Sequence, residues 1–247
     1  MSKQSGLGDN LYVGGYNLSG DTGSLERVSG SQAVLDVTGI DKSARERIGG
    51  LRDGAIDWTA YYNPAATKAH PVLSALPRTD VLVTYCRGTA IGSPAACCTA
   101  KQVNYDPKRS ADGGLMFSVS SQANSYGLEW GQLLTAGVRT DTTATNGTSL
   151  DTAASASFGG QAYLHVFGVT GTSVTVTIED SADDSSFAAV TSFAFAAVAD
   201  PGPGTERIAI GNTATIRRYV RAVTTGTFTA ASFAVVLVKN EIAGQVF

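Results

Sequence analysis

Short runs of strand-forming residues, each closed by turn residues, fill the second half of this sequence. Six such runs follow residue 158: QAYLHVFGV, TSVTVTIED, SSFAAVTSF, GTERIAIG, IRRYVRAV and GTFTAASFAVVLVK. Gly, Pro, Asn or Asp residues separate them, as in TGTS, DSADDSS, DPGPG and TTGT. Runs of this composition and spacing are typical of an all-β domain. The sequence therefore predicts a β-sandwich here, of immunoglobulin-like or jelly-roll type.

The first half of the sequence mixes strand patterns with one helix pattern. Strand-length runs are SQAVLDVTG, GAIDWTAYYN, DVLVTYCRG, PAACCTAKQVNY and GGLMFSVSSQ. The segment ATKAHPVLSALPRTD predicts a helix, because Pro71 is tolerated in a first turn and Pro77 ends it. The segment DKSARERIGGL has an N-cap candidate at Asp41 and stops at Gly49 and Gly50, which allows at most a short helix. We expect a mainly β chain.

A polar stretch over residues 140–157 separates the two halves. It contains no aromatic residue and one large aliphatic residue, Leu150. Such a stretch cannot bury a face of its own and is typical of a linker or an extended connecting arm. We therefore expect a first domain over 1–141, a linker over 142–157 and a sandwich domain over 158–247.

Low charge excludes several partners. Charged residues make up 16% of the 247 residues and the formal net charge is −3, so bulk electrostatics would not attract nucleic acid. No apolar run approaches the roughly 18 residues of a membrane span. The opening MSKQSGLGDN has no apolar core of signal-peptide length. We expect a protein made in the cytosol that does not bind membranes.

The residues that usually carry catalysis are few and scattered. There are two histidines, His70 and His165, and the sequence contains no HExxH, GxSxG or phosphate-binding glycine motif. The three cysteines, Cys86, Cys97 and Cys98, form no disulfide framework. The vicinal pair suggests either a redox or soft-metal site in an enzyme or small thiols packed in a strand, and we prefer packing. We expect no enzymatic activity, no metal and no cofactor.

Two polar clusters in the second half allow binding. The segment DSADD, residues 180–184, offers oxygens that calcium would accept, although a solvated hairpin explains it as well. In RRYVR, the residues Arg217, Tyr219 and Arg221 share one strand face. They are candidates for an outer-face site that binds a sugar, an acidic surface or a neighbouring subunit. The alternative is a solvated face with paired charges.

The strand YGLEWGQLLTAG has two unlike faces. Period two places Leu128, Trp130 and Leu134 on one face, and Gly127, Glu129 and Gly131 on the other. The large residues are core candidates; the complete set of core candidates is Trp58, Leu128, Trp130 and Leu134. Glu129 has no neighbouring histidine, paired carboxylate or metal cluster in the sequence, so we do not expect it to be a catalytic acid.

The first half resembles the major tail proteins of long-tailed, non-contractile bacteriophages. The resemblance covers residues 6–137 in order, through YVGGYNLSGDTGSL, LDVTGIDKSARERIGGLRDGAIDWTAYYN, HPVL, VTYCRGTAIGSPA, KQVNYDPKRSADGGLMFSVSSQ and YGLEWGQLLTAG. The second half resembles the β-sandwich appended to many such proteins. The family fold implied for the first half is a pair of packed β-sheets flanked by a helix, which would lie at 66–76.

The resemblance also implies a function. Six copies of such a protein form a ring, and their inner sheets join into one β-barrel. Rings stack into a tail tube around a tape-measure protein, between tail-tip and tail-terminator proteins, and DNA later leaves through the lumen. The implied location is the virion tail, assembled in the host cytoplasm. Segments 18–31 and 41–54 and the N-terminal arm would make contacts between rings. The family supplies no catalytic residues.

A wall along which DNA passes should not bind phosphate tightly. The candidate lining strands are poor in basic residues, which makes Asp57, Glu129, Gly127 and Gly131 candidates for lumen-facing positions. The alternative function is a carbohydrate- or host-surface-binding sandwich on a virion. That alternative rests on the sandwich pattern and on aromatic residues such as Tyr163 and Tyr219.

Overall fold

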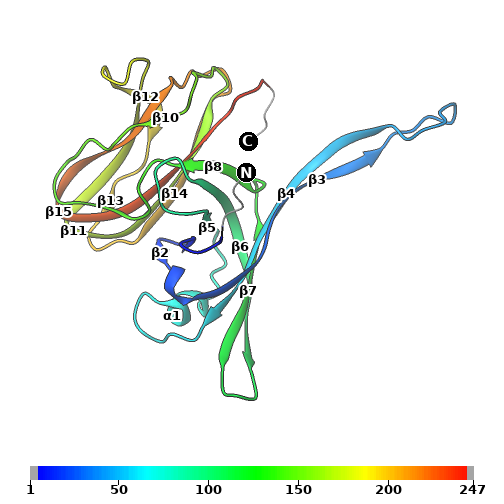
Figure 1. Cartoon of the computed structure of the whole chain (residues 1–247), viewed down its shortest axis with the longest axis horizontal. Coiled ribbons are helices and arrows are strands. Elements are labelled where there is room, and N and C mark those ends of the chain that lie inside the picture. The colour runs from blue at the N-terminus through cyan, green and yellow to red at the C-terminus, as the bar shows by residue number, and fades with distance from the viewer. Residues whose placement is uncertain (1–4, 244–247) are drawn as a thin grey trace.

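The computed structural model describes residues 5–243, so the outermost part of the expected N-terminal contact arm lies outside the described residues. The chain is mainly β, as predicted. Its elements are β1 (Asn10–Val13), β2 (Tyr16–Asn17), η1 (Ser19–Asp21), β3 (Thr22–Asp36), β4 (Arg47–Tyr61), α1 (Ala69–Leu73), β5 (Val81–Cys86), β6 (Pro94–Arg109), β7 (Leu115–Ala123), β8 (Glu129–Leu133), β9 (Arg139–Asp141), β10 (Leu150–Asp151), β11 (Gly160–Ser181), β12 (Ala188–Ala194), β13 (Val198–Ala199), β14 (Gly204–Ile210) and β15 (Tyr219–Lys239). Figure 1 shows a sandwich built from the second half, a body built from the first half, and two hairpins that project from that body.

The body is an antiparallel arrangement in which β4 pairs with β7, β7 with β6, β6 with β5 and β5 with β1. The helix α1 packs here through Ala69 and Leu73, which are fully buried. A helix is therefore present where one was predicted, but it is shorter than 66–76. Lys68 before it is extended, and Leu76 after it has a positive φ of 40°, so neither continues the helix.

No helix forms in the segment DKSARERIGGL. Residues 41–46 belong to the connection between β3 and β4, and β4 begins at Arg47. The opposing strand explains the difference, because Asp36 pairs with Arg47 and Leu35 with Ile48. These backbone groups are satisfied across the hairpin and not along a helical turn.

The sandwich is built on two long strands. The runs expected as separate strands are joined: QAYLHVFGV and TSVTVTIED form β11, and most of IRRYVRAV joins GTFTAASFAVVLVK in β15. The two strands pair along their whole length, with register shifts near Gly171. Gly171 and Gly226 have φ values of 133° and 118°, which residues with a side chain rarely adopt. These glycines and bulges let the ladder bend and continue where turns were expected.

Three buried clusters hold the chain together. One lies in the body, around Trp58 and Leu73, and one lies in the sandwich, around Phe193 and Phe233. The third joins the halves through residues from both, such as Tyr12, Leu133 and Tyr163. Strand β8 lies between them in the sheet, pairing with β6 on one side and with β15 on the other. The halves therefore share a continuous sheet, and the expected domain limits stay a prediction.

The polar stretch after residue 141 runs along the sandwich in extended form. Within it, β10 pairs with the start of β15, and Leu150 is buried. Just before it, Arg139 donates to the carboxylate of Asp141 at 2.8 and 2.7 Å, and Thr224 donates to Asp141 at 2.7 Å. The stretch is thus fastened to β15 just before its start, through Asp141, and near its middle, through β10.

Candidate assembly surface

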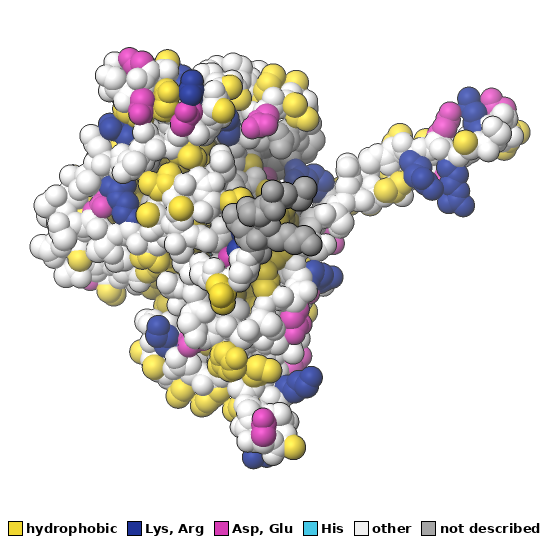
Figure 2. Space-filling model, viewed as in Figure 1, with side chains coloured by type: hydrophobic (Ala, Val, Ile, Leu, Met, Phe, Trp, Pro, Cys, Tyr) yellow, Lys and Arg dark blue, Asp and Glu magenta, His cyan; other side chains and the backbone are white. Residues whose placement is uncertain are grey.

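The outer part of the β3–β4 hairpin, residues 31–53, projects from the body and is here called the arm (Figures 1 and 2). Its paired positions run from Ser31 opposite Asp53 to Asp36 opposite Arg47. Every arm residue except the half-buried Thr38 and Gly50 is exposed. Among the described strands, β3 pairs only with β4, so its other edge is open along 15 residues.

Large apolar side chains are concentrated on the arm. Those that are exposed are Val34, Leu35, Val37, Ile40, Ile48 and Leu51. Single exposed apolar residues are ordinary on a protein surface, but a contiguous group marks an interaction site. Leu35 lies directly opposite Ile48, so these two side chains form a cross-strand pair that no part of the described chain covers.

Asp57 lies at the base of the same hairpin. Its carboxylate accepts hydrogen bonds from Arg27 Nε at 2.6 Å and from Ser120 Oγ at 2.6 Å. It points away from the neighbouring buried residues Ile56 and Trp58. Asp57 therefore lies on the outer face of the sheet, as a lumen-facing residue would. That this face lines a lumen stays a prediction.

Glu129 is not exposed, so the expectation that it faces a lumen is wrong for this chain. It is buried between the halves, where Arg207 Nη2 lies 3.0 Å from Oε1 and Arg207 Nε lies 3.1 Å from Oε2. The hydroxyl of Tyr163 also donates to Glu129. The Arg207 guanidinium lies 3.7 Å from the ring centroid of Tyr126. Burial, together with the Glu129 charge, raises the pKa of Tyr163, which keeps its proton as a donor.

Trp130 is 54% exposed, so its assignment to the core is also wrong, whereas Trp58, Leu128 and Leu134 are buried as predicted. Since neighbouring strand residues point to opposite faces, an inward Glu129 turns Trp130 outward. Trp130 lines two hollows of about 390 and 270 Å³, one lined also by Gln132 and the other by Gln32.

The two glycines of this strand serve close packing and not a lumen surface. Gly127 is buried, and an added Cβ there would lie 3.1 Å from Arg52 Cβ. At Gly131 an added Cβ would lie 2.4 Å from the carbonyl oxygen of Leu237 in β15. Only glycine allows β15 to approach β8 so closely.

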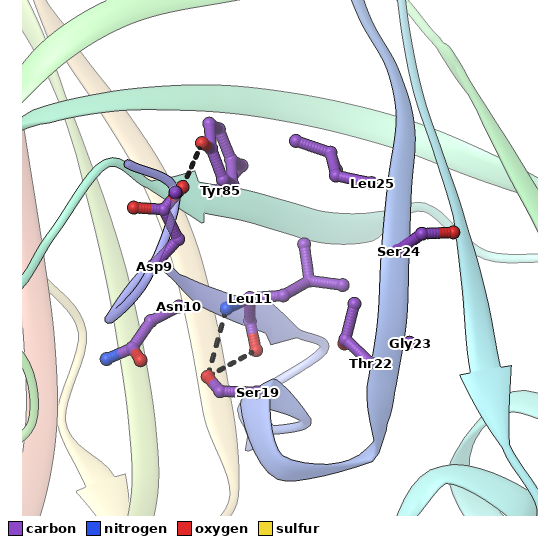
Figure 3. A pocket seen from close by; sticks show the side chains of 10 residues that line it. Asp9, Asn10, Leu11, Ser19, Thr22, Gly23, Ser24, Leu25 and Tyr85 are labelled. Carbon is purple, nitrogen blue, oxygen red and sulfur yellow. Dashed lines mark hydrogen bonds between the residues drawn. The ribbon is translucent and has the colours of Figure 1, made fainter. Parts of the chain in front are cut away.

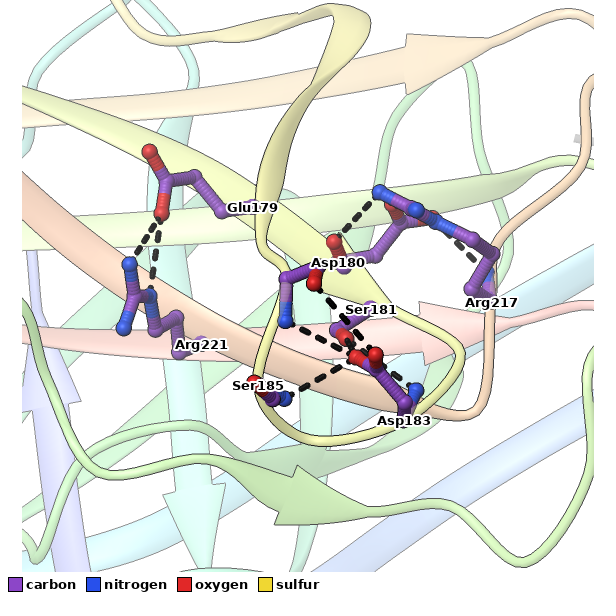
Figure 4. A network of polar contacts seen from close by, with 8 residues as sticks. Glu179, Asp180, Ser181, Asp183, Ser185, Arg217 and Arg221 are labelled. Atoms are coloured by element: carbon purple, nitrogen blue, oxygen red, sulfur yellow. Dashed lines mark hydrogen bonds and ion pairs between the residues drawn. The ribbon is translucent and has the colours of Figure 1, made fainter.

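The arginines of RRYVR are paired within the sandwich (Figure 4). Arg217 Nη2 lies 2.6 Å from Asp180 Oδ1, and Arg221 Nη2 lies 2.7 Å from Glu179 Oε2. The Arg221 guanidinium also lies 4.0 Å from the ring centroid of Phe187. The charges are therefore paired, as in the alternative, although the Asp180 side chain is buried and not solvated, and these arginines already hold carboxylates of the chain.

The segment DSADD forms a turn held by its own hydrogen bonds (Figure 4). The Asp183 carboxylate accepts from Ser186 N at 2.8 Å, Ser181 Oγ at 2.7 Å and Ser185 N at 3.0 Å, and these bonds lower its pKa. Within residues 5–243, no group of three or more His, Cys, Asp or Glu side chains could hold a metal ion. The hydrogen bonds of Asp183 within this turn agree with the interpretation of DSADD as a hairpin.

The cysteines are buried free thiols. Burial raises the pKa of Cys86 and Cys98 to about 12, and that of Cys97 well above its ordinary value. Thr84 Oγ1 lies 2.9 Å from His165 Nε2 and 3.6 Å from Cys97 Sγ. Burial lowers the pKa of His165 to about 3, so it is a neutral imidazole in a closed core. The thiols stay protonated and out of reach of solvent, which fits the packing interpretation.

A hollow of about 290 Å³ lies between β1 and the base of the β3–β4 hairpin (Figure 3). Its polar groups already have partners. The Asp9 carboxylate accepts from Tyr85 Oη at 2.5 Å and from Arg87 Nη1 at 2.7 Å, and Ser19 Oγ accepts from Leu11 N at 3.0 Å.

In the part of the chain that the structure describes, no helix has the length and apolar character to cross a membrane.

Neither a protein-family profile nor a curated protein matches this sequence. Among solved structures, a chain in the virion of a native gene transfer agent particle is 14% identical, with a TM-score of 0.42 over 52% of this chain and 98% of that one. A chain in the tail of an empty gene transfer agent particle with C6 symmetry is 16% identical, with a TM-score of 0.40 over 51% and 97%. The Dit protein of SPP1, a paradigm of the hub adsorption apparatus in phages that infect Gram-positive bacteria, is 12% identical, with a TM-score of 0.31 over 92% of this chain and 98% of that one. These likenesses are distant, and no function follows from them.

Proposed function

We propose that this chain is a structural subunit of a phage tail that assembles with copies of itself through the arm. The observation that carries the proposal is the group of exposed apolar side chains on a hairpin that leaves the body. The hairpin lies in the part of the sequence that resembles major tail proteins, and it contains one of the segments expected to make contacts there, 41–54. An exposed apolar group of this kind marks a surface that a partner covers.

In the finer form of the proposal, six subunits form a ring, and rings stack into a tube around a tape-measure protein. The open edge of β3 supports ring closure, because a long unpaired strand edge is a liability unless another strand pairs with it. Closing a sheet into a barrel removes all such edges. Asp57 would face the lumen, where its pair with Arg27 leaves no net positive charge to retain DNA.

The role we propose is non-catalytic and needs no cofactor. The charged groups between the halves and on the sandwich pair with one another. The competing proposal of a glycan- or host-binding sandwich finds little support in the residues named for it. Tyr163 is buried, and Arg217 and Arg221 already hold carboxylates.

Electron microscopy of the purified full chain tests the proposal, and we expect hexameric rings or hollow tubes. Leu35→Ser with Ile48→Ser should abolish assembly while leaving circular dichroism unchanged, because both side chains are exposed in the subunit. Leu76→Ser removes another exposed apolar side chain, 44% exposed and away from the arm, and is the control. A wild-type chain that stays monomeric at high concentration, even with tail-tip proteins present, would contradict the proposal.

A further inference from the structure

The two faces of the β3–β4 hairpin exchange roles between its base and its arm. At the base, Leu25 pairs with Trp58 and Val28 with Ile56, and this face packs into the body's own core. We call it the core-side face. The opposite face carries Arg27 paired with Asp57. We call it the far face. At the base it is the polar one.

The register carries both faces into the arm. Residues directly opposite each other share a face, and faces alternate along each strand. From Val28 and Ile56 outward, the core-side face passes through Gly30 with Gly54 and then Gln32 with Arg52. The far face passes through Ser29 with Ala55 and Ser31 with Asp53.

A bulge in β4 then adds one residue to the far face. Gln32 pairs with Arg52 but Val34 pairs with Gly49, so Gly50 and Leu51 together oppose Ala33. An added Cβ at Gly50 would lie 3.2 Å from Ala33 Cβ, whereas one at Gly49 would meet the Gln32 side chain. These contacts place Gly50 on the far face with Ala33, and Gly49 on the core-side face with Gln32. Leu51, which directly precedes the core-side Arg52, is therefore on the far face.

The result is an arm whose apolar side is the far face. That face carries Ala33 and three of the exposed large apolar residues: Leu35, Ile48 and Leu51. The core-side face of the arm carries Gln32, Arg52, Asp36 and Arg47, with Val34 as its one large apolar residue. A hairpin that packed only on its own body would keep its apolar residues on one face throughout.

We propose that the arm docks through its far face on a second copy of this chain, with the core-side face of the arm left outside the contact. The inference rests on the proposed self-assembly and adds to it which face binds. The subunit's own core lies on the core-side face, so it cannot cover Leu35 and Ile48.

The charges of the arm favour a copy of this chain over a polyanion. The arm carries four acidic residues and four basic residues: Asp36, Asp41, Glu46 and Asp53 against Lys42, Arg45, Arg47 and Arg52. Several of them pair within the arm, as Lys42 does with Glu46 at 3.6 Å and Arg45 with Asp36 at 3.9 Å. A neutral arm with an apolar face fits a partner of low charge with apolar surface. This chain has a net charge of −3 and exposes Tyr61, Tyr62, Val103 and Trp130 outside the arm.

Val34 and Leu35 provide a matched test, since they are neighbours on opposite faces and are 63% and 50% exposed in the subunit. Each is replaced by Cys in turn, and the rate of maleimide labelling is compared before and after tube assembly. The native thiols are buried with raised pKa values, so they remain silent in the folded protein. Thr213→Cys on the sandwich, an exposed position, serves as the accessible control.

We expect assembly to slow labelling of Leu35→Cys at least tenfold while Val34→Cys stays within threefold of its free rate. Leu35→Asp should prevent assembly and Val34→Asp should permit it. Equal protection of both thiols, or protection of Val34→Cys alone, would overturn the choice of face. Tubes in which Leu35→Cys stays reactive until other virion proteins are added would overturn the choice of partner. A wild-type chain that forms no tubes contradicts the proposed function itself, which is a separate result.

Discussion

At the residue scale, the contacts of Glu129 show where sequence patterns stop being informative. Period two correctly separates the two faces of its strand, but it does not say which face is inward. The partner that decides the matter is Arg207, which lies 78 residues away in the sequence. A buried carboxylate needs such a partner, because unpaired burial of a charge is very costly. No local sequence pattern indicates a pair between residues so far apart. The prediction therefore assigned Trp130 to the core, whereas the pair turns Glu129 inward and Trp130 outward.

Arg207→Met would leave the Glu129 charge buried without its partner. We expect the free energy of unfolding in urea to fall by about 3–5 kcal/mol. The double variant Glu129→Leu with Arg207→Met should recover part of this loss, because it replaces the ion pair with apolar groups but leaves the Tyr163 hydroxyl without its acceptor. Arg218→Met, which removes an exposed pair with Asp151, is the control and should lower the free energy of unfolding far less, because solvent screens an exposed pair. Equal losses for Arg207→Met and Arg218→Met would contradict the role given to burial.

His165 predicts an acid dependence of stability. Burial lowers its pKa to about 3, whereas the unfolded chain has the ordinary value of 6.5. Below pH 6.5 the unfolded state therefore binds a proton that the folded state does not. The free energy of unfolding then decreases as the pH is lowered, by about 1.4 kcal/mol per pH unit at most. The unfolding free energy should drop by about 2 kcal/mol between pH 7 and pH 5. His165→Phe should remove most of this drop; an unchanged drop in that variant would assign it to other groups.

At the element scale, strand positions were predictable and strand ends were not. The alternating runs around Trp58 and in the second half all became strands. The sequence analysis did not predict that neighbouring runs join into β11 and β15, because glycine is typical of turns. In the structure, Gly171 and Gly226 instead lie within a continuous, bent pair of strands. In the arm, the run SQAVLDVTG was expected as a strand and residues 41–54 as a contact segment, but the long hairpin was not, since its length comes from pairing between β3 and β4.

Gly131 tests the close approach of β8 and β15. Gly131→Ala would place a methyl group 2.4 Å from the Leu237 carbonyl oxygen, so the strands must move apart. Overpacking of this kind costs roughly 1–3 kcal/mol, measurable as a lower urea midpoint. Gly211→Ala is the matched control, because an added Cβ there meets nothing within 4 Å. A Gly131→Ala variant as stable as Gly211→Ala would show that the two strands have room to separate.

At the scale of the whole molecule, the sequence indicated two halves, and the structure adds the sheet that joins them. Strand β8 pairs with β6 through Ala95 to Cys97 and with β15 through Val236 and Leu237. Composition alone predicted the polar stretch between the halves. The pairing of β8 with β15 joins residues about a hundred positions apart, and no local sequence pattern predicts such a pairing.

This pairing has a consequence for the order of events during synthesis. The ribosome completes the arm early, and β8 follows well before β15, the last strand of the described chain. At roughly 5–20 residues per second, β8 waits about 5–20 seconds for its second neighbour. Until then the sheet between the halves is unfinished, and Glu129 has no Arg207. The chain thus completes the arm long before the sheet between the halves, so the contact proposed for the arm could form only after a second copy has finished folding.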